Sequence, residues 1–236
     1  MKVRIGVVTA GTTNPPELMC APYLLGRRLL YGVMSNGGGS LQWLSQLSGQ
    51  PIDRLIALPR SNSDDLLFLP YLNGERSPIW DSNASGVFLG LRTAHGLGDL
   101  AHAVMQGVAF SLRQNLELVE QHASLKVQTV VVSGGAARLQ TWNRIKANVL
   151  SKRIVTQKSP HAGILGIAVL AAVATGVYPT IESAAESMIH TAALLEPRED
   201  LRPRANRMFD IYKRSYPALR DIFTDLSAIN QGELDQ

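Results

Sequence analysis

The chain has 236 residues, of which 45% are hydrophobic and 18% charged, and its formal net charge is +4. This size and composition indicate a globular chain with a sizeable core. Basic residues near the C-terminus alternate with acidic ones, which is typical of a solvated helix face and argues against a nucleic-acid patch. Cys20 is the only cysteine, so an intrachain disulfide is excluded and a reducing, cytoplasmic location is expected.

The first segments of the chain predict strands. Residues 3–10 and 29–34 are rich in β-branched and apolar side chains, and residues 19–24 offer a third strand. A turn-rich connection lies at residues 11–16. This order favours an antiparallel meander.

A glycine run precedes the first predicted helix. Residues 37–40 read Gly-Gly-Gly-Ser and lead into a segment with helical spacing, for which Ser40 is a favoured N-cap type. Glycines at such a place let a ligand approach the backbone closely. Residues 51–62 then predict a short helix and a polar loop.

Residues 68–90 form a loop punctuated by proline and glycine after an apolar run at 66–71. Such loops carry recognition or domain contacts, because a rigid scaffold displays function on its loops. Glu75, Arg76 and Asp81 supply two carboxylates and a guanidinium. They predict either a structural salt bridge with a turn or a hydrolase site, and the second interpretation lacks a nucleophile.

The longest predicted helix begins with Asp99 as its N-cap and continues to about His122. Its apolar positions recur at steps of three and four residues: Leu100, Val104, Val108, Leu112, Leu116 and Val119. This spacing is that of an amphipathic helix.

A strand–helix–strand–helix unit follows. Its predicted strands are residues 127–132 and 153–157, and its predicted helices are residues 139–150 and 163–175. This order implies parallel pairing with right-handed crossovers. Residues 162–178 are uncharged over 17 positions, which is too short to span a bilayer, so a buried core helix is expected.

Surface helices are predicted near residues 181–190 and 205–216, with Pro217 ending the second. Three β segments, a helix and a βαβα unit give the order of a ribonuclease-H-like layer. The predicted fold class is therefore α/β, of the type found in actin, hexokinase and heat-shock-chaperone ATPases, with a mixed five-stranded sheet flanked by helices.

Two glycine turns are candidates for phosphate binding, residues 37–40 and the pair Gly134-Gly135 after a predicted strand. Backbone N–H groups clustered at the start of a helix bind phosphate with a favourable dipole. Close packing of the backbone against a neighbouring element explains a glycine pair as well as phosphate binding does. No GxxxxGK[ST] motif is present, which argues against a P-loop. The five histidines show no metal-ligand spacing.

The residues that follow the loop carry a family resemblance. Residues 86–91, GVFLGL, and residues 99–106, DLAHAVMQ, are separated by seven residues and resemble the C-terminal signature of the FGGY carbohydrate kinases. The surrounding sequence looks most like the xylulokinase branch of that family. The similarity runs from about residue 5 to residue 223.

Kinases of this family consist of two ribonuclease-H-like domains with a nucleotide cleft between them. The resemblance covers only the second of these domains. It implies a single domain over residues 1–236, with its core at 3–178 and a helical extension at 180–230. The N-terminal kinase domain is expected to be absent from the chain.

The resemblance assigns nucleotide contacts to both glycine turns. GGGSLQWL resembles the segment that contacts ATP through a glycine and a glutamine four residues later, here Gly38 and Gln42. VSGGAARLQTWNRI resembles the strand–Gly-Gly–helix unit that holds adenine and the α-phosphate, with Gly134 shaping the turn and Gly135 on the nucleotide. A polar residue often stands four positions after that glycine, so Leu139 implies the loss of one hydrogen bond.

The chain departs from the family in two further respects. A Gly-Thr pair that contacts the phosphates is replaced by Val3-Arg4 or Arg4-Ile5. The aspartate general base, most sugar contacts and most of the Mg²⁺ site belong to the family's N-terminal half, so no catalytic residue and no metal ligand is expected here.

The resemblance therefore implies the C-terminal, nucleotide-binding half of an ATP-dependent sugar kinase, inactive by itself, with ATP and Mg²⁺ as cofactors. The expected partners are a sugar substrate and either an N-terminal kinase half or a second copy, with neither nucleic acid nor a membrane. The alternative is a non-catalytic nucleotide-binding or regulatory module, which Leu139 and the lost Gly-Thr pair favour.

Overall fold

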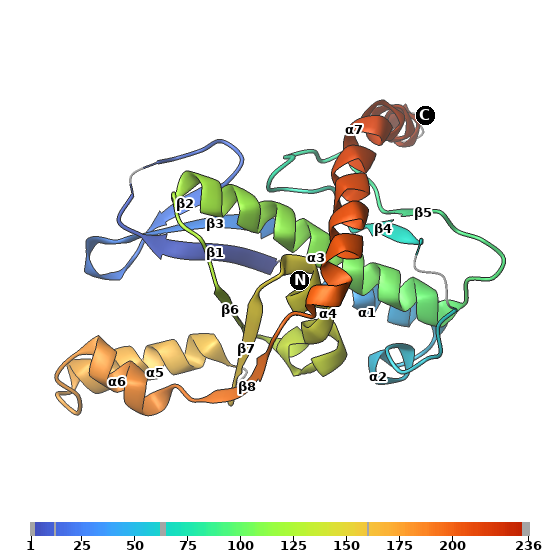
Figure 1. Cartoon of the computed structure of the whole chain (residues 1–236). Coiled ribbons are helices and arrows are strands. Elements are labelled where there is room, and N and C mark those ends of the chain that lie inside the picture. The colour runs from blue at the N-terminus through green and yellow to red at the C-terminus, as the bar shows by residue number, and fades with distance from the viewer. Residues whose placement is uncertain (1–2, 12, 62–64, 160, 233–236) are drawn as a thin grey trace. The chain divides into compact units, whose positions relative to one another are not determined.

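Figure 1 presents the computed structural model of the chain, which describes residues 3–11, 13–61, 65–159 and 161–232. Its contacts group the chain into two compact units, Met1–Lys126 with Asp200–Gln236, and Val127–Glu199. We call these unit 1 and unit 2 and describe each by itself. The expectation of one domain over residues 1–236, with a core and a helical extension, stays a prediction.

Unit 1 begins with an antiparallel sheet of β1 (Val3–Thr9), β2 (Met19–Pro22) and β3 (Arg28–Met34). The three predicted strands are confirmed, but the meander order is wrong because the observed order is β1-β3-β2. β3 takes the centre because it carries the sheet's most buried side chains, including Val33 and Met34. A central strand pairs along both edges and can bury the most apolar surface.

Helix α3 (Leu97–His122) packs against β1, β3 and β4 and forms the core of unit 1. It ends at His122 as predicted. Its N-cap is Gly96, so the prediction of Asp99 as the cap is wrong. Asp99 lies three residues further on and accepts a 2.9 Å hydrogen bond from the Gly96 amide through Oδ2. This is the reciprocal half of a capping box, a role that a carboxylate fills as readily as the cap itself.

A two-stranded sheet of β4 (Leu67–Leu69) and β5 (Val87–Leu89) lies beside α3. All three β4 side chains are buried. The Phe68 ring packs against Trp43 and Phe88, at centroid distances of 6.2 and 4.6 Å. A Cβ on Gly107 of α3 would collide with the Phe68 carbonyl oxygen, so glycine permits this close approach.

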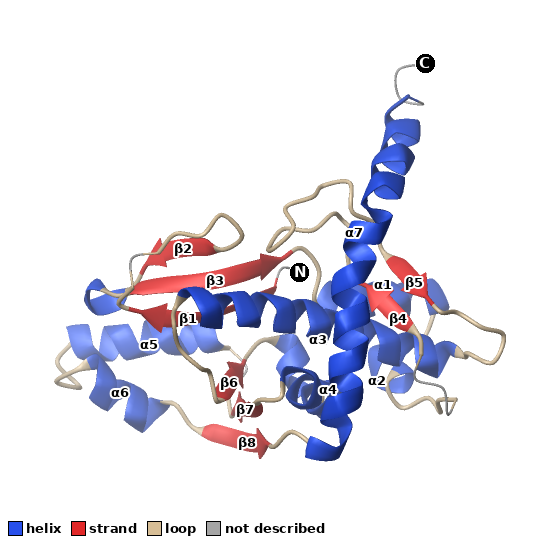
Figure 2. Cartoon of the chain, turned by 45° about the horizontal axis from the view of Figure 1, so that its top comes forward, coloured by secondary structure: helices blue, strands red, loops and turns tan. Residues whose placement is uncertain are grey.

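The remaining helices of unit 1 are α1 (Gly38–Ser48), α2 (Ile52–Leu55) and α7 (Arg202–Gly232), with a 3-10 turn at Leu24–Gly26. α7 is visible as the long helix in Figure 2, and its 31 residues exceed the 26 of α3. The prediction that Pro217 ends this helix is wrong. Tyr216 and Phe223 stack across the proline at 6.5 Å, and this packing carries the helix past it.

The described residues of unit 2 form a mixed sheet with three α-helices. Its strands are β6 (Thr129–Val132), β7 (Arg153–Gln157) and β8 (Thr191–Leu195), and its helices are α4 (Gln140–Leu150), α5 (Ala162–Ala174) and α6 (Ile181–Met188). β6 and β7 pair in parallel, as predicted. The antiparallel partner β8 was missed. It lies inside the segment expected to be a helical extension.

The described strands form sheets of three, two and three strands, so a single five-stranded sheet is not confirmed. That prediction joined the first three strands to β6 and β7. The structure assigns these two groups to different units. The α/β class itself agrees with the mixture of helices and sheets.

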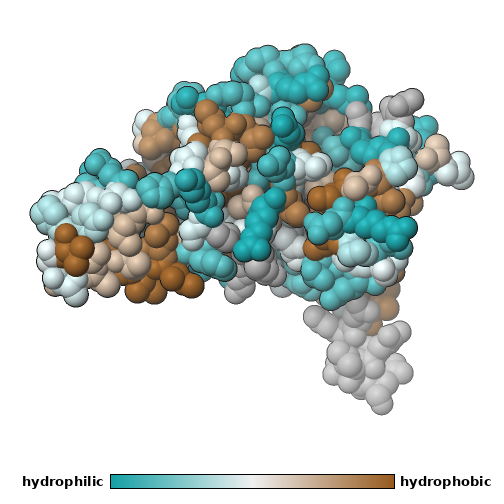
Figure 3. Space-filling model, turned by 90° about the horizontal axis from the view of Figure 1, so that it is seen from below, coloured by the Kyte–Doolittle hydropathy of each residue, from teal (hydrophilic) through white to brown (hydrophobic). Residues whose placement is uncertain are grey.

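The prediction that residues 162–178 form a buried core helix is wrong. Within α5 only Val169 is buried, whereas Ile164 and Ile167 are 68% and 70% exposed. Figure 3 shows apolar side chains gathered over this part of unit 2. α5 packs on α6, and a helix that is apolar on all sides cannot bury every face against one neighbour. None of the helices within the described ranges is long and apolar enough to cross a membrane.

Candidate functional site

The first candidate element is the turn at residues 37–40, which we call the glycine turn. Helix α1 begins at Gly38 with Gly37 as its N-cap. The prediction of Ser40 as the cap is wrong, because its side chain is fully buried and its amide donates to the Gly37 carbonyl at 3.1 Å. Gly38 is half-buried and Gln42, one turn later, is exposed. Residues four apart share a helix face, so both can meet one ligand.

The second candidate element is the turn after β6. Gly134 has φ +84° and ψ −176°, a conformation that is essentially restricted to glycine. A Cβ placed on Gly134 or Gly135 would meet no atom within 4 Å. Space rather than packing therefore surrounds both glycines, and this backbone is open to a ligand. The predicted turn is confirmed, and it continues as the 3-10 helix Gly135–Arg138.

Leu139 connects this turn to α4. It occupies the N-cap position, and its side chain makes no capping hydrogen bond. Its carbonyl accepts the Asn143 amide at 3.0 Å. A serine or asparagine here would bond the free amides of the first helical turn, which leucine cannot do. Leucine at position 139 therefore leaves α4 without a side-chain cap, in addition to the nucleotide hydrogen bond that the resemblance implies is lost.

Two side-chain hydrogen bonds that the sequence analysis missed join the turn after β6 to α4. Nδ2 of Asn143 donates to the Ala137 carbonyl at 2.7 Å, and Nζ of Lys146 donates to Oδ1 of Asn143 at 3.1 Å. Lys146 is only 7% exposed and lies over the Trp142 ring at 4.9 Å. Burial lowers the pKa of Lys146 to about 8. Helical spacing with Trp142 and Ile145 was the only sequence signal that this lysine faces inward.

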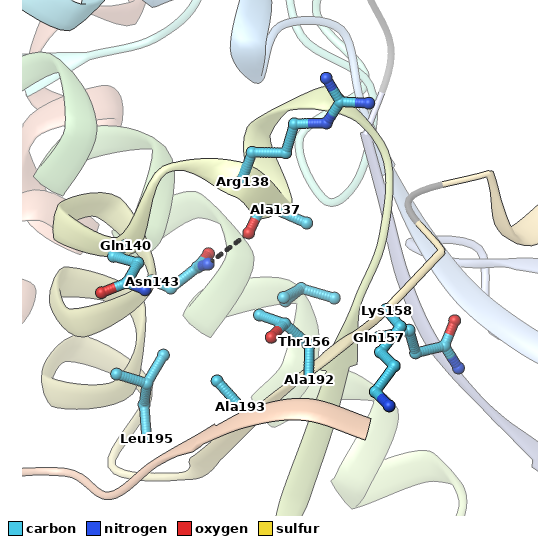
Figure 4. Close-up of a pocket in the computed structure, with 11 residues that line it drawn as sticks. Ala137, Arg138, Gln140, Asn143, Thr156, Gln157, Lys158, Ala192, Ala193 and Leu195 are labelled. Carbon is cyan, nitrogen blue, oxygen red and sulfur yellow. Dashed lines mark hydrogen bonds between the residues drawn. The ribbon is translucent and has the colours of Figure 1, made fainter. Parts of the chain in front are cut away.

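A cavity of about 360 Å³ opens where β6 and β7 end (Figure 4). The carboxyl ends of parallel strands are the usual ligand edge of such sheets, and this volume suits a small ligand. The Arg138 and Lys158 side chains extend in different directions in Figure 4, so they do not form one cationic cluster. The lining residues are Val132, Ala137, Arg138, Gln140, Asn143, Thr156, Gln157, Lys158, Ala192, Ala193 and Leu195.

The two carboxylates of the loop between β4 and β5 have different hydrogen-bond partners. Glu75 is 4% exposed, and Oε1 accepts the amides of Ser35 and Arg76 at 2.6 and 2.8 Å. Burial raises the pKa of Glu75 to about 7. Oδ2 of Asp81 instead accepts the Tyr216 hydroxyl at 2.8 Å. The loop is thus a structural part of unit 1, in which Glu75 bonds the Arg76 amide and each of the two carboxylates has hydrogen-bond partners of its own.

The predicted site residues fall into two groups. Gly38 and Gln42 lie together on α1 in unit 1, and Gly134, Gly135 and Leu139 lie together in unit 2. Residues 3–5, at which the resemblance led us to expect a Gly-Thr pair, form part of β1. Among the described residues, no group of three or more His, Cys, Asp and Glu side chains could hold a metal ion.

Solved structures define the class of protein. A ligand-bound xylulose kinase from Lactobacillus acidophilus matches with a TM-score of 0.84 and 26% identity, covering 94% of this chain and 46% of the kinase. A gluconate kinase from the same organism matches with a TM-score of 0.82, 26% identity and the same coverage. The fold is that of the sugar kinases, within the actin and hexokinase class of ATPases, as predicted.

Sequence comparison defines the family. The profile of the FGGY family of carbohydrate kinases, C-terminal domain, matches residues 7–175. A xylulose kinase of Bacillus subtilis (strain 168) is 32% identical over 206 residues, which cover 85% of this chain and 41% of the relative. The chain belongs to the FGGY family of carbohydrate kinases and corresponds to their C-terminal domain. It spans about two fifths of the length of the curated relatives that it matches.

Proposed function

We propose that this chain is the nucleotide-binding half of an ATP-dependent sugar kinase of the xylulokinase type. In that reaction a sugar hydroxyl attacks the γ-phosphorus of ATP, and ADP leaves. The observation that carries the proposal is the Gly134 turn, whose glycine-only conformation opens the backbone within a segment that matches the family. Phosphoryl transfer depends on positioning and on charge stabilisation, both of which backbone N–H groups can supply.

The glycine turn and the turn after β6 each have a proposed role. Gly38 and Gln42 offer a backbone amide and a side-chain amide to ATP. Gly134 shapes the second turn and Gly135 approaches the nucleotide. Leu139 leaves one hydrogen bond unmade, which predicts an affinity below that of a chain with a polar residue at this position.

Mg²⁺ is the cofactor that the family implies, and it would neutralise charge on the phosphates. The described residues do not fit a site for it, since no cluster of ligating side chains is found among them. We propose that the metal is held mainly by residues outside this chain. The general base that accepts the sugar proton is assigned outside it as well.

The proposed partner is an N-terminal kinase half, which would also bring the sugar. Exposed apolar side chains on α5, among them Ile164 and Ile167, support an association that covers them. A second copy of the chain is the alternative partner that could cover these side chains of α5. We also propose a reducing, cytoplasmic location, which the single cysteine supports.

Two assays on the 236-residue chain test the function. Calorimetric titration should detect ADP and ATP binding, and a coupled assay should detect no phosphorylation of xylulose. Robust turnover of xylulose by the chain alone would contradict the proposal that the general base lies outside it. Absence of binding at millimolar nucleotide would overturn the nucleotide role.

The second candidate is a non-catalytic nucleotide-binding or regulatory module. Leu139 at the α4 N-cap and the β1 strand in place of a Gly-Thr pair favour it. Mixing the chain with a separately produced N-terminal half of a xylulose kinase discriminates the two. Restored turnover supports the kinase half, whereas binding without turnover supports the module.

A further inference from the structure

The loop between β4 and β5 is tied to the segment that directly precedes the glycine turn. Both lie in unit 1. Three hydrogen bonds join them: the Ser77 amide to the Val33 carbonyl at 3.0 Å, the Ser35 amide to Oε1 of Glu75 at 2.6 Å, and Nδ2 of Asn73 to Oδ1 of Asn36 at 3.2 Å. The course of the chain from the end of β3 to Gly37 therefore depends on this loop.

The loop itself is fixed to the core of the unit. Glu75 and Asp81 exchange backbone hydrogen bonds of 2.8 and 3.0 Å. Nδ2 of Asn115, on α3, donates to the Ser77 carbonyl at 3.1 Å. The Tyr216 hydroxyl of α7 donates to Asp81. Because its own backbone hydrogen bonds and two separate helices, α3 and α7, hold it, the loop can act as a rigid support for the glycine turn.

Glu75 is the charged group of this support. A single oxygen, Oε1, accepts the amide of Ser35 and the amide of Arg76, so it joins segments 40 residues apart in the sequence. Hydrogen bonds to an ionised carboxylate are about twice as strong as neutral ones. The carboxylate is buried, which excludes water as a competing donor.

We propose that Glu75 is a positioning residue for nucleotide binding, because its buried carboxylate holds Ser35 and thereby sets the glycine turn that presents Gly38. This inference rests on the proposed nucleotide role of Gly38. It adds a residue that touches neither the nucleotide nor the sugar.

The support that Glu75 gives to the glycine turn should depend on whether its carboxyl group is protonated. Burial raises the pKa of Glu75 to about 7, and the hydrogen bonds from Ser35 and Arg76 oppose this rise. The other titratable or charged groups facing Glu75 are Tyr71 in the loop itself, Tyr212 on α7 and the Arg76 guanidinium. Below pH 7 the protonated carboxyl binds the two amides more weakly, so nucleotide affinity should fall there.

The test compares four forms of the full chain: unaltered, Glu75→Ala, Glu75→Gln and the control Asp99→Ala. Asp99 is also a buried carboxylate bonded to backbone amides, those of Gly96 and Ser61, but it lies at the start of α3 rather than at the glycine turn. ADP affinity is measured by calorimetry at about pH 6 and about pH 8. Hydrogen–deuterium exchange is measured for the amides of residues 35–40.

We expect Glu75→Ala to weaken ADP binding about tenfold, as for the loss of a charge-assisted bond, and to accelerate exchange at residues 35–40. Glu75→Gln should restore most of the affinity that Glu75→Ala loses. The affinity ratio of the unaltered chain to Glu75→Gln should exceed one at pH 8 and approach one at pH 6, since the nucleotide's own titration cancels in this ratio. Asp99→Ala should leave affinity within about twofold.

Equal loss of affinity in Glu75→Ala and Asp99→Ala would overturn the positioning role, because general destabilisation would then explain both. Unchanged exchange at residues 35–40 in Glu75→Ala would overturn the support itself. If the unaltered chain binds no ADP, the proposed function fails and the nucleotide role of Glu75 fails with it. The exchange measurement then still decides whether Glu75 holds the turn.

Discussion

Replacing Glu75 by glutamine should remove a pH dependence from the stability of unit 1. The carboxyl has an ordinary pKa of 4.5, and burial raises the pKa to about 7 in the folded chain. The folded state therefore holds a proton that the unfolded state has already released between these values. The protonated carboxyl contributes stability that is fully present below pH 4.5 and is lost as the pH rises through about 7.

The size of this effect follows from the pKa shift. A shift from 4.5 to about 7 corresponds to about 3 kcal/mol at 1.36 kcal/mol for each pKa unit. Glutamine keeps an oxygen acceptor for the amides of Ser35 and Arg76 and does not titrate. The free energy of unfolding of the unaltered chain, relative to Glu75→Gln, should therefore fall by about 3 kcal/mol between pH 4.5 and pH 8.

Urea unfolding of both forms at four pH values measures this difference, and subtraction removes the contribution of every other titrating group. Tryptophan fluorescence reports the transition, with contributions from Trp43, which packs on Phe68, and Trp80 in unit 1, and from Trp142 in unit 2. Parallel stability curves for the two forms would refute the reasoning, since they would mean that Glu75 titrates at its ordinary pKa. A difference that grows in the opposite direction would mean that the folded state prefers the ionised form.

Three further substitutions have expected outcomes. Leu139→Asn should stabilise the chain by about 1 kcal/mol, because asparagine caps α4, and it should also tighten ADP binding. Leu139→Ala is the control, and equal melting temperatures of Leu139→Asn and Leu139→Ala would contradict the capping argument. Lys146→Met should raise stability by about 3 kcal/mol at pH 7, since the buried ammonium, whose pKa falls from 10.5 to about 8, opposes folding until it loses its proton. Denaturation at pH 7 and pH 10.5 checks this, because the gain should nearly vanish at the higher pH. Gly107→Ala should destabilise unit 1 by about 2 kcal/mol or more through its collision with Phe68, and calorimetric melting that matches the unaltered chain would contradict that close approach.

Local patterns predicted those elements whose form depends on neighbouring residues. The strand at 153–157 agrees with β7 in both bounds, because an apolar β-branched run between helices has one strong local preference. The end of α3 at His122 was predicted from its apolar spacing. The turn at Gly134 was predicted from the strand and the glycine pair, since positive φ requires glycine.

Elements that depend on distant partners were missed. Residues 191–195, TAALL, have the small apolar composition of a helix and become β8 only by pairing with β7. The uniform apolarity of α5 does not say which faces are covered. Glu75 was considered as half of a salt bridge, whereas its main partner is the Ser35 amide, which no local pattern indicates.

We propose that the glycine turn and the turn after β6 both bind nucleotide. Hydrogen–deuterium exchange of the unaltered chain with and without saturating ADP tests it most directly. We expect slower exchange at residues 37–42 and at residues 134–139, with little change in the exposed helices α5 and α6. Protection at neither turn, or protection elsewhere alone, would contradict it.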